Sequence, residues 1–290
     1  MVSVVYEAPN SIEDALRLLE SAEMPAKVLA GGTDLIIQTN GSKDSDRLIV
    51  DVKKIEGMLD ARIENDFLEL GPSMSCADFT ARADIKKLFP GLVEAAFLIG
   101  STQVQGRASV GGNLCNASPA ADTIPALMVN QATCEISGQN GNRSVPVENF
   151  VTGVGTNCLT GSELLRLIKV PLPAKRSADA YLRFIPRTEM DIAVAGAAVR
   201  LSLDNKGICS SARISIGAVA PTAILVEKAA QSLVGTRLDE TTLGKAAMAA
   251  SEASSPITDR RGTAEYRRHV VGVLVKRAAE IARIRAEGNQ

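Results

Sequence analysis

The sequence predicts an α+β fold in two modules, and three observations support this prediction. Strand and helix signals alternate near the start of the chain, two β-hairpin signals follow, and three strands succeeded by helices close the chain. A proline-containing stretch, residues 171–177, is the best candidate for a linker. We therefore expect one module over residues 1–176, with subdomains of about 1–58 and 59–176, and a second module over residues 177–290.

The first subdomain is expected to alternate short strands with helices. The strand signals are runs rich in Val, Ile and Leu at residues 2–6, 27–30 and 47–52. Ser11 is followed by two acidic residues and then by leucines at helical spacing, which predicts a helix capped by Ser11. Leu35 begins a second helical turn that should end at Asn40–Gly41.

The second subdomain is expected to contain two hairpins. Residues 61–70 alternate in hydropathy around Asn65–Asp66, and residues 132–147 do so around Asn140–Gly141. Helical patterns and one further strand are expected at residues 76–83, 91–99 and 163–170.

The C-terminal module follows a different pattern. Its strands are expected at residues 181–185, 196–203 and 212–219, with a turn at 203–207 between the second and the third. Its helices are expected at residues 223–232, 241–253 and 263–286. Strands followed by helices indicate an α+β unit with its own core.

The composition excludes several classes of protein. Its 32 Lys and Arg residues against 33 Asp and Glu give a net charge of −1, without the basic excess of nucleic-acid-binding proteins. No apolar run approaches the roughly 18 residues of a membrane span, and no secretory signal is visible. The single histidine, His269, cannot form a multi-histidine metal site, and five scattered cysteines favour a reduced, cytoplasmic protein.

Two glycine loops are the most informative motifs: Ala-Gly-Gly-Thr-Asp at 30–34 and Ser-Val-Gly-Gly-Asn at 109–113. Glycine allows positive φ and close approach to a ligand, and successive backbone N–H groups can bind an anion. Neither loop matches a dinucleotide fingerprint or a phosphate loop. From the residues alone, a Gly-Gly pair is most often an ordinary tight turn. A phosphate-bearing cofactor held by backbone amides is the functional alternative.

The extended motifs, residues 30–35 and 109–122, resemble the FAD-binding medium subunit of the molybdenum hydroxylases, the carbon monoxide and xanthine dehydrogenase family. Residues 191–195 and 259–268 resemble two later segments of that family, in the same order. The resemblance covers nearly the whole chain. It implies a PCMH/VAO-like FAD-binding module of two subdomains, followed by a flavoprotein C-terminal domain with a three-stranded sheet and helices.

The resemblance implies that FAD lies extended between the two N-terminal subdomains. The residues that would wrap or face its pyrophosphate and ribityl chain are Val28, Leu29, Ala30, Gly31, Gly32, Thr33, Asp34, Leu35, Ser109, Val110, Gly111, Gly112 and Asn113. Ile99 and Leu165 would pack on the cofactor. Asp122 would accept hydrogen bonds from its ribose, ribityl chain or ring, and Arg183 would lie close to the flavin.

Without the family resemblance, a purely structural role is the alternative for each of four residues: Ile99, Asp122, Leu165 and Arg183. Asp122 could be a helix N-cap, Ile99 and Leu165 could be core residues, and Arg183 could be a surface charge. Two positions also depart from the family pattern. Arg183 stands where lysine is frequent, and Gln105–Gly106 stand where Arg-Asn is frequent, so the start of the second loop is expected to be held differently.

The resemblance also implies partners. A large subunit would carry a molybdopterin-type molybdenum cofactor and oxidise the substrate, and a small subunit would carry [2Fe-2S] clusters. Electrons would pass through these clusters to FAD on this chain and then to an external acceptor, in a dimer of heterotrimers. This chain would supply no catalytic residue and no metal ligand. A β-branched residue at Gly32 or Gly112 is expected to lower its FAD content.

Two other functions stay open. One is a self-sufficient flavin-dependent oxidoreductase of related fold, which would need its own substrate pocket with acid–base residues. The other is a non-catalytic assembly subunit that has lost FAD, which the intact Gly31–Gly32 and Gly111–Gly112 pairs disfavour.

Overall fold

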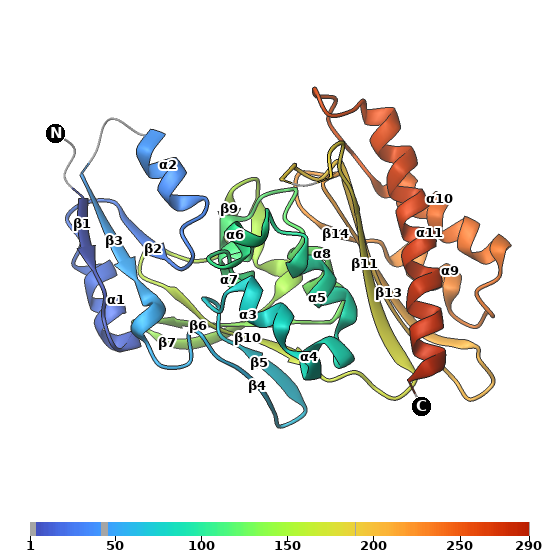
Figure 1. The fold of residues 1–290 in the computed structure, drawn as a ribbon, viewed down its shortest axis with the longest axis horizontal. Coiled ribbons are helices and arrows are strands. Elements are labelled where there is room, and N and C mark those ends of the chain that lie inside the picture. Colours follow the sequence, from blue (N-terminus) through green and yellow to red (C-terminus); the bar gives the residue numbers. More distant parts are fainter. Residues whose placement is uncertain (1–3, 42–45, 189, 290) are drawn as a thin grey trace.

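A computed structural model describes residues 4–41, 46–188 and 190–289 (Figure 1). The first subdomain holds a three-stranded parallel sheet of order β1-β3-β2. Its elements are β1 (Val4–Glu7), α1 (Ile12–Glu20), β2 (Ala26–Leu29), α2 (Leu35–Gly41), β3 (Arg47–Asp51) and the 3-10 turn η1 (Val52–Lys54). The expected strand at 2–6 begins in residues that lie outside the described ones.

The start of α1 agrees with its sequence signal. The Ser11 hydroxyl accepts a hydrogen bond from the Asp14 backbone N–H at 3.1 Å, so the predicted N-cap is confirmed. Ala15, Leu16 and Leu19 of α1 are buried against the parallel sheet. Leu164 of the next subdomain joins this small core, and this apolar contact connects the two subdomains.

The second subdomain is built on a five-stranded antiparallel sheet of order β4-β5-β10-β6-β7. Its strands are β4 (Ala61–Glu64), β5 (Phe67–Leu70), β6 (Thr133–Gly138), β7 (Gly141–Pro146) and β10 (Leu164–Pro171), and a separate small pair is β8 (Val151–Gly153) with β9 (Thr156–Asn157). Both predicted hairpins are confirmed. Asn65 and Asp66 have φ values of 49° and 65°, as a two-residue hairpin turn requires.

Short helices pack on this sheet in one core. They are α3 (Cys76–Ala81), α4 (Ala83–Leu88), α5 (Pro90–Phe97), α6 (Thr102–Gln105), α7 (Val110–Asn116) and α8 (Thr123–Val129). The helix predicted over 76–83 is confirmed as α3, which ends two residues early because Arg82 has extended backbone. The following helix, α4, was not predicted. The Arg82 guanidinium donates to the Ala61 carbonyl at 2.9 Å, so a contact with β4 competes with the local helical pattern.

The C-terminal module is an antiparallel sheet covered by helices, at the right of Figure 1. Its elements are β11 (Ser177–Phe184), β12 (Ala195–Leu203), β13 (Cys209–Gly217), β14 (Ile224–Leu225), α9 (Glu227–Leu233), α10 (Glu240–Ala253) and α11 (Ala264–Gly288). No helix in the described ranges has the length and apolar character needed to cross a membrane.

The α+β class is confirmed, with one correction in this module. The sheet has a fourth strand, β14, where the sequence predicted the start of a helix at Ala223. Ile224 and Leu225 pair with β13, and the Val226 N–H donates to the Ile214 carbonyl at 2.8 Å. Sheet pairing therefore delays the helix to Glu227.

A buried carboxylate connects the C-terminal sheet to the second subdomain. Asp179 of β11 accepts hydrogen bonds from the N–H groups of Gly91 and Leu92, at 2.8 and 3.0 Å, and so caps α5. It also accepts one from the Asn130 amide at 2.7 Å. A Cβ on Gly91 would lie 2.7 Å from the backbone nitrogen of Ala180, so α5 touches β11 directly.

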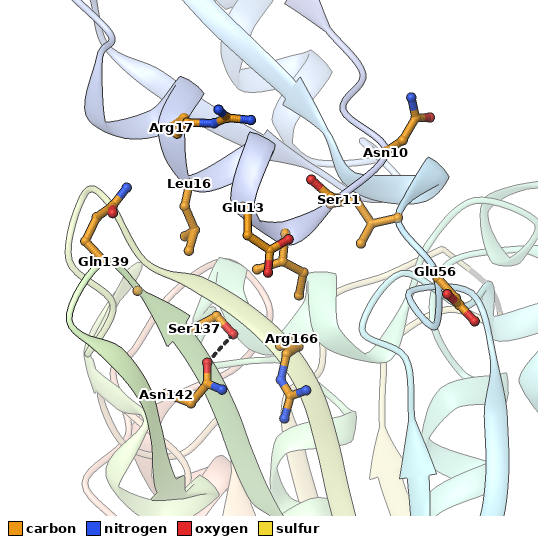
Figure 2. Close-up of a pocket in the computed structure, with 13 residues that line it drawn as sticks. Asn10, Ser11, Glu13, Leu16, Arg17, Glu56, Ser137, Gln139, Asn142 and Arg166 are labelled. Carbon is orange, nitrogen blue, oxygen red and sulfur yellow. Dashed lines mark hydrogen bonds between the residues drawn. The ribbon is translucent and has the colours of Figure 1, made fainter.

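A surface groove of about 770 Å³ separates α1 from the central sheet (Figure 2). Glu13 of α1 and Ser11, the N-cap of that helix, face Ser137, Asn142 and Arg166 across it. The Ser137 hydroxyl donates to the Asn142 side-chain oxygen at 2.7 Å. None of the predicted site residues lines this groove, so the glycine loops meet elsewhere between the two subdomains.

Candidate functional site

The two glycine loops line one cavity of about 420 Å³, between the parallel sheet and the helices of the second subdomain. The predicted residues that line it are Val28, Ala30, Gly31, Gly32, Thr33, Asp34, Leu35, Ile99, Ser109, Gly111, Gly112, Asn113 and Leu165. The predicted residues outside its lining are Leu29, Val110, Asp122 and Arg183. Tertiary structure therefore joins motifs that lie far apart in the chain.

The first loop requires glycine at both of its central positions. A Cβ on Gly31 would lie 1.8 Å from the Arg107 carbonyl oxygen, because the first loop passes directly against the start of the second. Gly32 has a φ of 79°, which side-chain-bearing residues rarely adopt. The ordinary-turn alternative does not account for the close approach of the two loops.

The backbone of the first loop offers hydrogen-bond donors to the cavity. Within the described ranges, no N–H group of residues 31–34 has a hydrogen-bond acceptor. The carbonyls of the same loop are used, because Gly32 and Asp34 accept bonds from Ile36 and Gln38 at 3.0 Å each. Successive free N–H groups beside a cavity are suited to an anion such as a pyrophosphate.

The second loop differs, because its donors are already used. The N–H groups of Gly111, Gly112 and Asn113 donate to the Pro72 carbonyl, the Ser109 hydroxyl and the Ser109 carbonyl, at 3.1, 3.0 and 2.9 Å. No sequence motif indicated this difference between the loops. The second loop thus contributes shape to the cavity more than it contributes free donors.

The two glycines of the second loop have different neighbours. A Cβ on Gly111 would meet the Cβ of Pro72 at 2.4 Å, so this glycine is needed for packing. A Cβ on Gly112 would meet only the Ser109 hydroxyl at 2.9 Å and the Ala30 Cβ at 3.9 Å. A side chain at Gly112 would therefore extend between the two loops with little effect on the core.

The start of the second loop is held by a glutamine. Gln105 is buried, and its side-chain amide donates to the Phe97 carbonyl at the end of α5. This bond connects α6 to the segment that carries Ile99 into the cavity wall. Gln105 is one of the two positions that stand where the family often has Arg-Asn. Its bond to the Phe97 carbonyl is the contact that this glutamine makes at the start of the second loop.

Asp122 and Arg183 form a buried pair next to the cavity. Arg183 Nη1 donates to one Asp122 oxygen at 2.7 Å, and the Tyr181 hydroxyl donates to the other at 2.8 Å. The Arg183 side chain is only 7% exposed, so its reading as a surface charge is wrong. Its Nε is buried without a hydrogen-bond partner in the described part of the chain.

Asp122 does occupy the N-cap position of α8, but its side chain makes no capping bond to that helix. The Asn113 side-chain oxygen takes that role, accepting from the N–H and the hydroxyl of Thr123 at 3.3 and 2.6 Å. Asn113 lines the cavity, so the cavity wall connects through Thr123 to the neighbouring Asp122. The arrangement places a charged, hydrogen-bonded pair one residue behind the wall.

Replacing Asp122 with asparagine should change how stability depends on pH. Burial raises the pKa of Asp122 from 3.8 to about 6, although Arg183 and Tyr181 oppose this. Between these pH values the folded chain retains a proton that the unfolded chain loses, so this contribution to the free energy of unfolding falls as pH rises. The advantage of wild type over Asp122→Asn should shrink by roughly 3 kcal/mol across that range in denaturant titrations. A difference in the free energy of unfolding between the two proteins that does not change with pH would contradict this prediction.

Several cavity residues carry no recognisable motif. They lie on the segment leading into β10 and on the far end of α7, and include Asn116, Asn157, Leu159, Thr160 and Glu163. The Asn157 amide donates to the Cys115 carbonyl at 2.8 Å and holds this rim against α7. Cys115 lines the cavity too, and burial raises the pKa of its thiol to about 12, so the thiol stays protonated. These residues reach the glycine loops through tertiary contacts, such as the bond between Asn157 of β9 and Cys115 of α7.

Comparisons with known proteins agree with this geometry. Residues 2–173 match the family model described as "FAD binding domain in molybdopterin dehydrogenase", and residues 180–282 match "CO dehydrogenase flavoprotein C-terminal domain". The carbon monoxide dehydrogenase medium chain of Afipia carboxidovorans is 33% identical, with 97% of each chain covered. The putative xanthine dehydrogenase FAD-binding subunit of Escherichia coli is 30% identical, over 98% of this chain and 97% of that one.

A solved structure shows the same fold. Carbon monoxide dehydrogenase from Hydrogenophaga pseudoflava matches with a TM-score of 0.93 and 31% identity, and the match covers 98% of each chain. Both modules of this chain are therefore matched in one relative, in the same order. The chain belongs to the family of FAD-binding medium subunits of molybdenum-containing dehydrogenases, and it is an oxidoreductase subunit.

Proposed function

We propose that this chain is the FAD-carrying electron-transfer subunit of a molybdenum hydroxylase complex. In this role it takes electrons from the [2Fe-2S] clusters of a partner subunit and passes them to an external acceptor. The observation that carries the proposal is the row of unused N–H groups at residues 31–34, in a cavity that both glycine loops line. Such donors fit a pyrophosphate.

Different residues of the chain would bind different parts of FAD. Residues 31–34 would bind the pyrophosphate, and Gly112 would leave room for the cofactor between the loops. Ile99 and Leu165 would supply apolar contact from the cavity wall. When bound, FAD would supply the electron-transfer chemistry, while the protein binds it, orients it and excludes water.

The buried Asp122–Arg183 pair would serve the flavin end of the site. Among the described residues the buried Nε of Arg183 has no hydrogen-bond partner, and burying such a donor is costly unless a ligand accepts from it. The family resemblance implies that these two positions lie near the flavin. We therefore include Asp122 and Arg183 in the proposed site, although neither lines the cavity of the described structure.

Two relatives support the proposed partners. The Afipia relative is named a medium chain of carbon monoxide dehydrogenase. The Hydrogenophaga structure is described as a carbon monoxide dehydrogenase that lacks the Mo-pyranopterin moiety of its molybdenum cofactor. We propose that this chain likewise assembles with a small iron–sulfur subunit and a large molybdenum subunit, as a dimer of heterotrimers. All five cysteines are free thiols, which supports a reducing, cytoplasmic location.

An absorption spectrum of the natively purified complex tests the proposal. We expect flavin absorption overlaid with iron–sulfur absorption, with both bleaching on addition of a reductant, and FAD in proportion to this chain. The variant Gly112→Val should purify in the same complex with little FAD, because its side chain extends between the loops.

Three other outcomes would each contradict the proposal. Flavin without iron–sulfur absorption, together with turnover of an organic substrate by the isolated chain, would indicate a self-sufficient flavoenzyme. A complex without flavin would indicate an assembly subunit. A normal FAD content in Gly112→Val would place the cofactor outside the cavity between the loops.

A further inference from the structure

A lysine that belongs to neither glycine motif lies behind the first loop. Lys53 of η1 donates from Nζ to the Ala30 carbonyl oxygen at 2.8 Å and to Asp51 Oδ1 at 2.7 Å. Its side chain is 22% exposed, so the ammonium is largely enclosed. Lys53 does not line the cavity, whereas Ala30 and Gly31 do.

This contact sets the direction of a peptide unit. The carbonyl and the N–H of a planar trans peptide point in opposite directions. Lys53 holds the Ala30 carbonyl by this bond and lies outside the cavity lining. The Gly31 N–H of the same peptide unit therefore points away from Lys53. That N–H is one of the unused donors of the first loop.

Lys53 is itself held in place by Asp51. The same carboxylate oxygen, Asp51 Oδ1, accepts from the backbone N–H of Lys53 at 3.0 Å, and the other oxygen accepts from the Tyr6 hydroxyl at 2.6 Å. Partial burial alone would raise the pKa of Asp51, but the bonds from Lys53 and Tyr6 outweigh it and hold that pKa below its usual range. Asp51 is therefore ionised at neutral pH and anchors the ammonium.

We propose that Lys53 is a positioning residue for the pyrophosphate of FAD. It orients the Ala30–Gly31 peptide so that the Gly31 N–H meets the phosphate oxygens, and it places a positive charge behind the loop. The charge attracts the pyrophosphate through the loop without touching it. This inference rests on the proposed FAD site and adds a residue that no motif indicated.

The test compares three variants of the full chain, freed of FAD and titrated with FAD at low and high salt. Lys53→Met keeps the aliphatic stem and removes the charge and the donor, so FAD affinity should fall about tenfold or more. The dependence of that affinity on salt should weaken as well, because one attractive charge is lost. Lys53→Arg keeps a charge and donors and should recover much of the affinity. Lys54→Met removes the neighbouring exposed lysine and should bind FAD like wild type.

The outcomes separate this inference from the proposed function. Equal FAD affinities of wild type and Lys53→Met, or equal losses in Lys53→Met and Lys54→Met, would overturn this inference alone. A loss in Lys53→Met with an unchanged salt dependence and no recovery in Lys53→Arg would indicate a merely structural role, and would also overturn it. Failure of the wild-type chain to bind FAD would overturn the proposed function and this inference together.

Discussion

Gly31→Ala should leave the chain almost without FAD. The added Cβ would lie 1.8 Å from the Arg107 carbonyl oxygen and 2.5 Å from its carbon, and backbone atoms cannot rotate away as a side chain can. The first loop would have to move away from the start of the second. The N–H groups of residues 31–34 would then no longer face the cavity wall that completes the site. The FAD released from the purified variant, measured per chain, gives the result directly.

A second glycine provides the matched control for this change. Gly244 lies inside α10, and a Cβ there would meet nothing within 4 Å. Gly244→Ala should retain the FAD content of wild type and gain roughly 0.5–1 kcal/mol in stability, since alanine favours a helix interior. If Gly31→Ala kept its FAD, the contact between the loops would not be needed for the cofactor.

Asp179→Ala should produce the largest loss of stability. The variant would leave the N–H groups of Gly91 and Leu92 and the amide of Asn130 without their acceptor, in a site where Asp179 is 2% exposed. Removing one member of a buried charged network typically costs about 3–5 kcal/mol. The loss should appear as a lower midpoint in denaturant titrations of the full chain.

Asp179 is also connected to the cavity, so its loss should affect FAD binding as well as stability. Its carboxylate caps α5, whose far end leads to Ile99 of the cavity, so the variant should also weaken FAD binding. Asp60→Ala is the control, because Asp60 pairs with Arg62 and both side chains are more than half exposed. That control should leave the midpoint unchanged. Equal midpoints of Asp179→Ala and Asp60→Ala would show that the buried network does not hold the two modules together.

Features that depend on neighbouring residues were predictable. Ser11 caps α1 because its hydroxyl reaches an N–H three residues away, and the Asn65–Asp66 turn needs only two residues that tolerate positive φ. The errors lie where a distant contact competes with a local pattern. Pairing with β13 converts the expected start of a helix into β14, and at Arg82, which contacts Ala61, α3 ends two residues before its expected end.

In the candidate site too, local motifs were predictable and contacts between distant residues were not. The glycine pairs and the family motifs indicated which segments would meet, and most of those residues do line one cavity. Asp122 and Arg183 lie behind the wall, paired with each other, because the energy of burying a charge depends on partners that the chain brings from far away. Nothing in the motifs indicated Lys53 or the rim around Asn157.

The sequence by itself determined the family, the α+β class, the two glycine loops and the kind of cofactor they suit, because these follow from residue type and local spacing. Only the tertiary structure decided which backbone donors stay free. The N–H groups of Gly111 and Gly112 find acceptors in Pro72 and Ser109, while those of residues 31–34 find none in the described chain. The physical reason is that a hydrogen bond is made or missed according to where the fold places the acceptor.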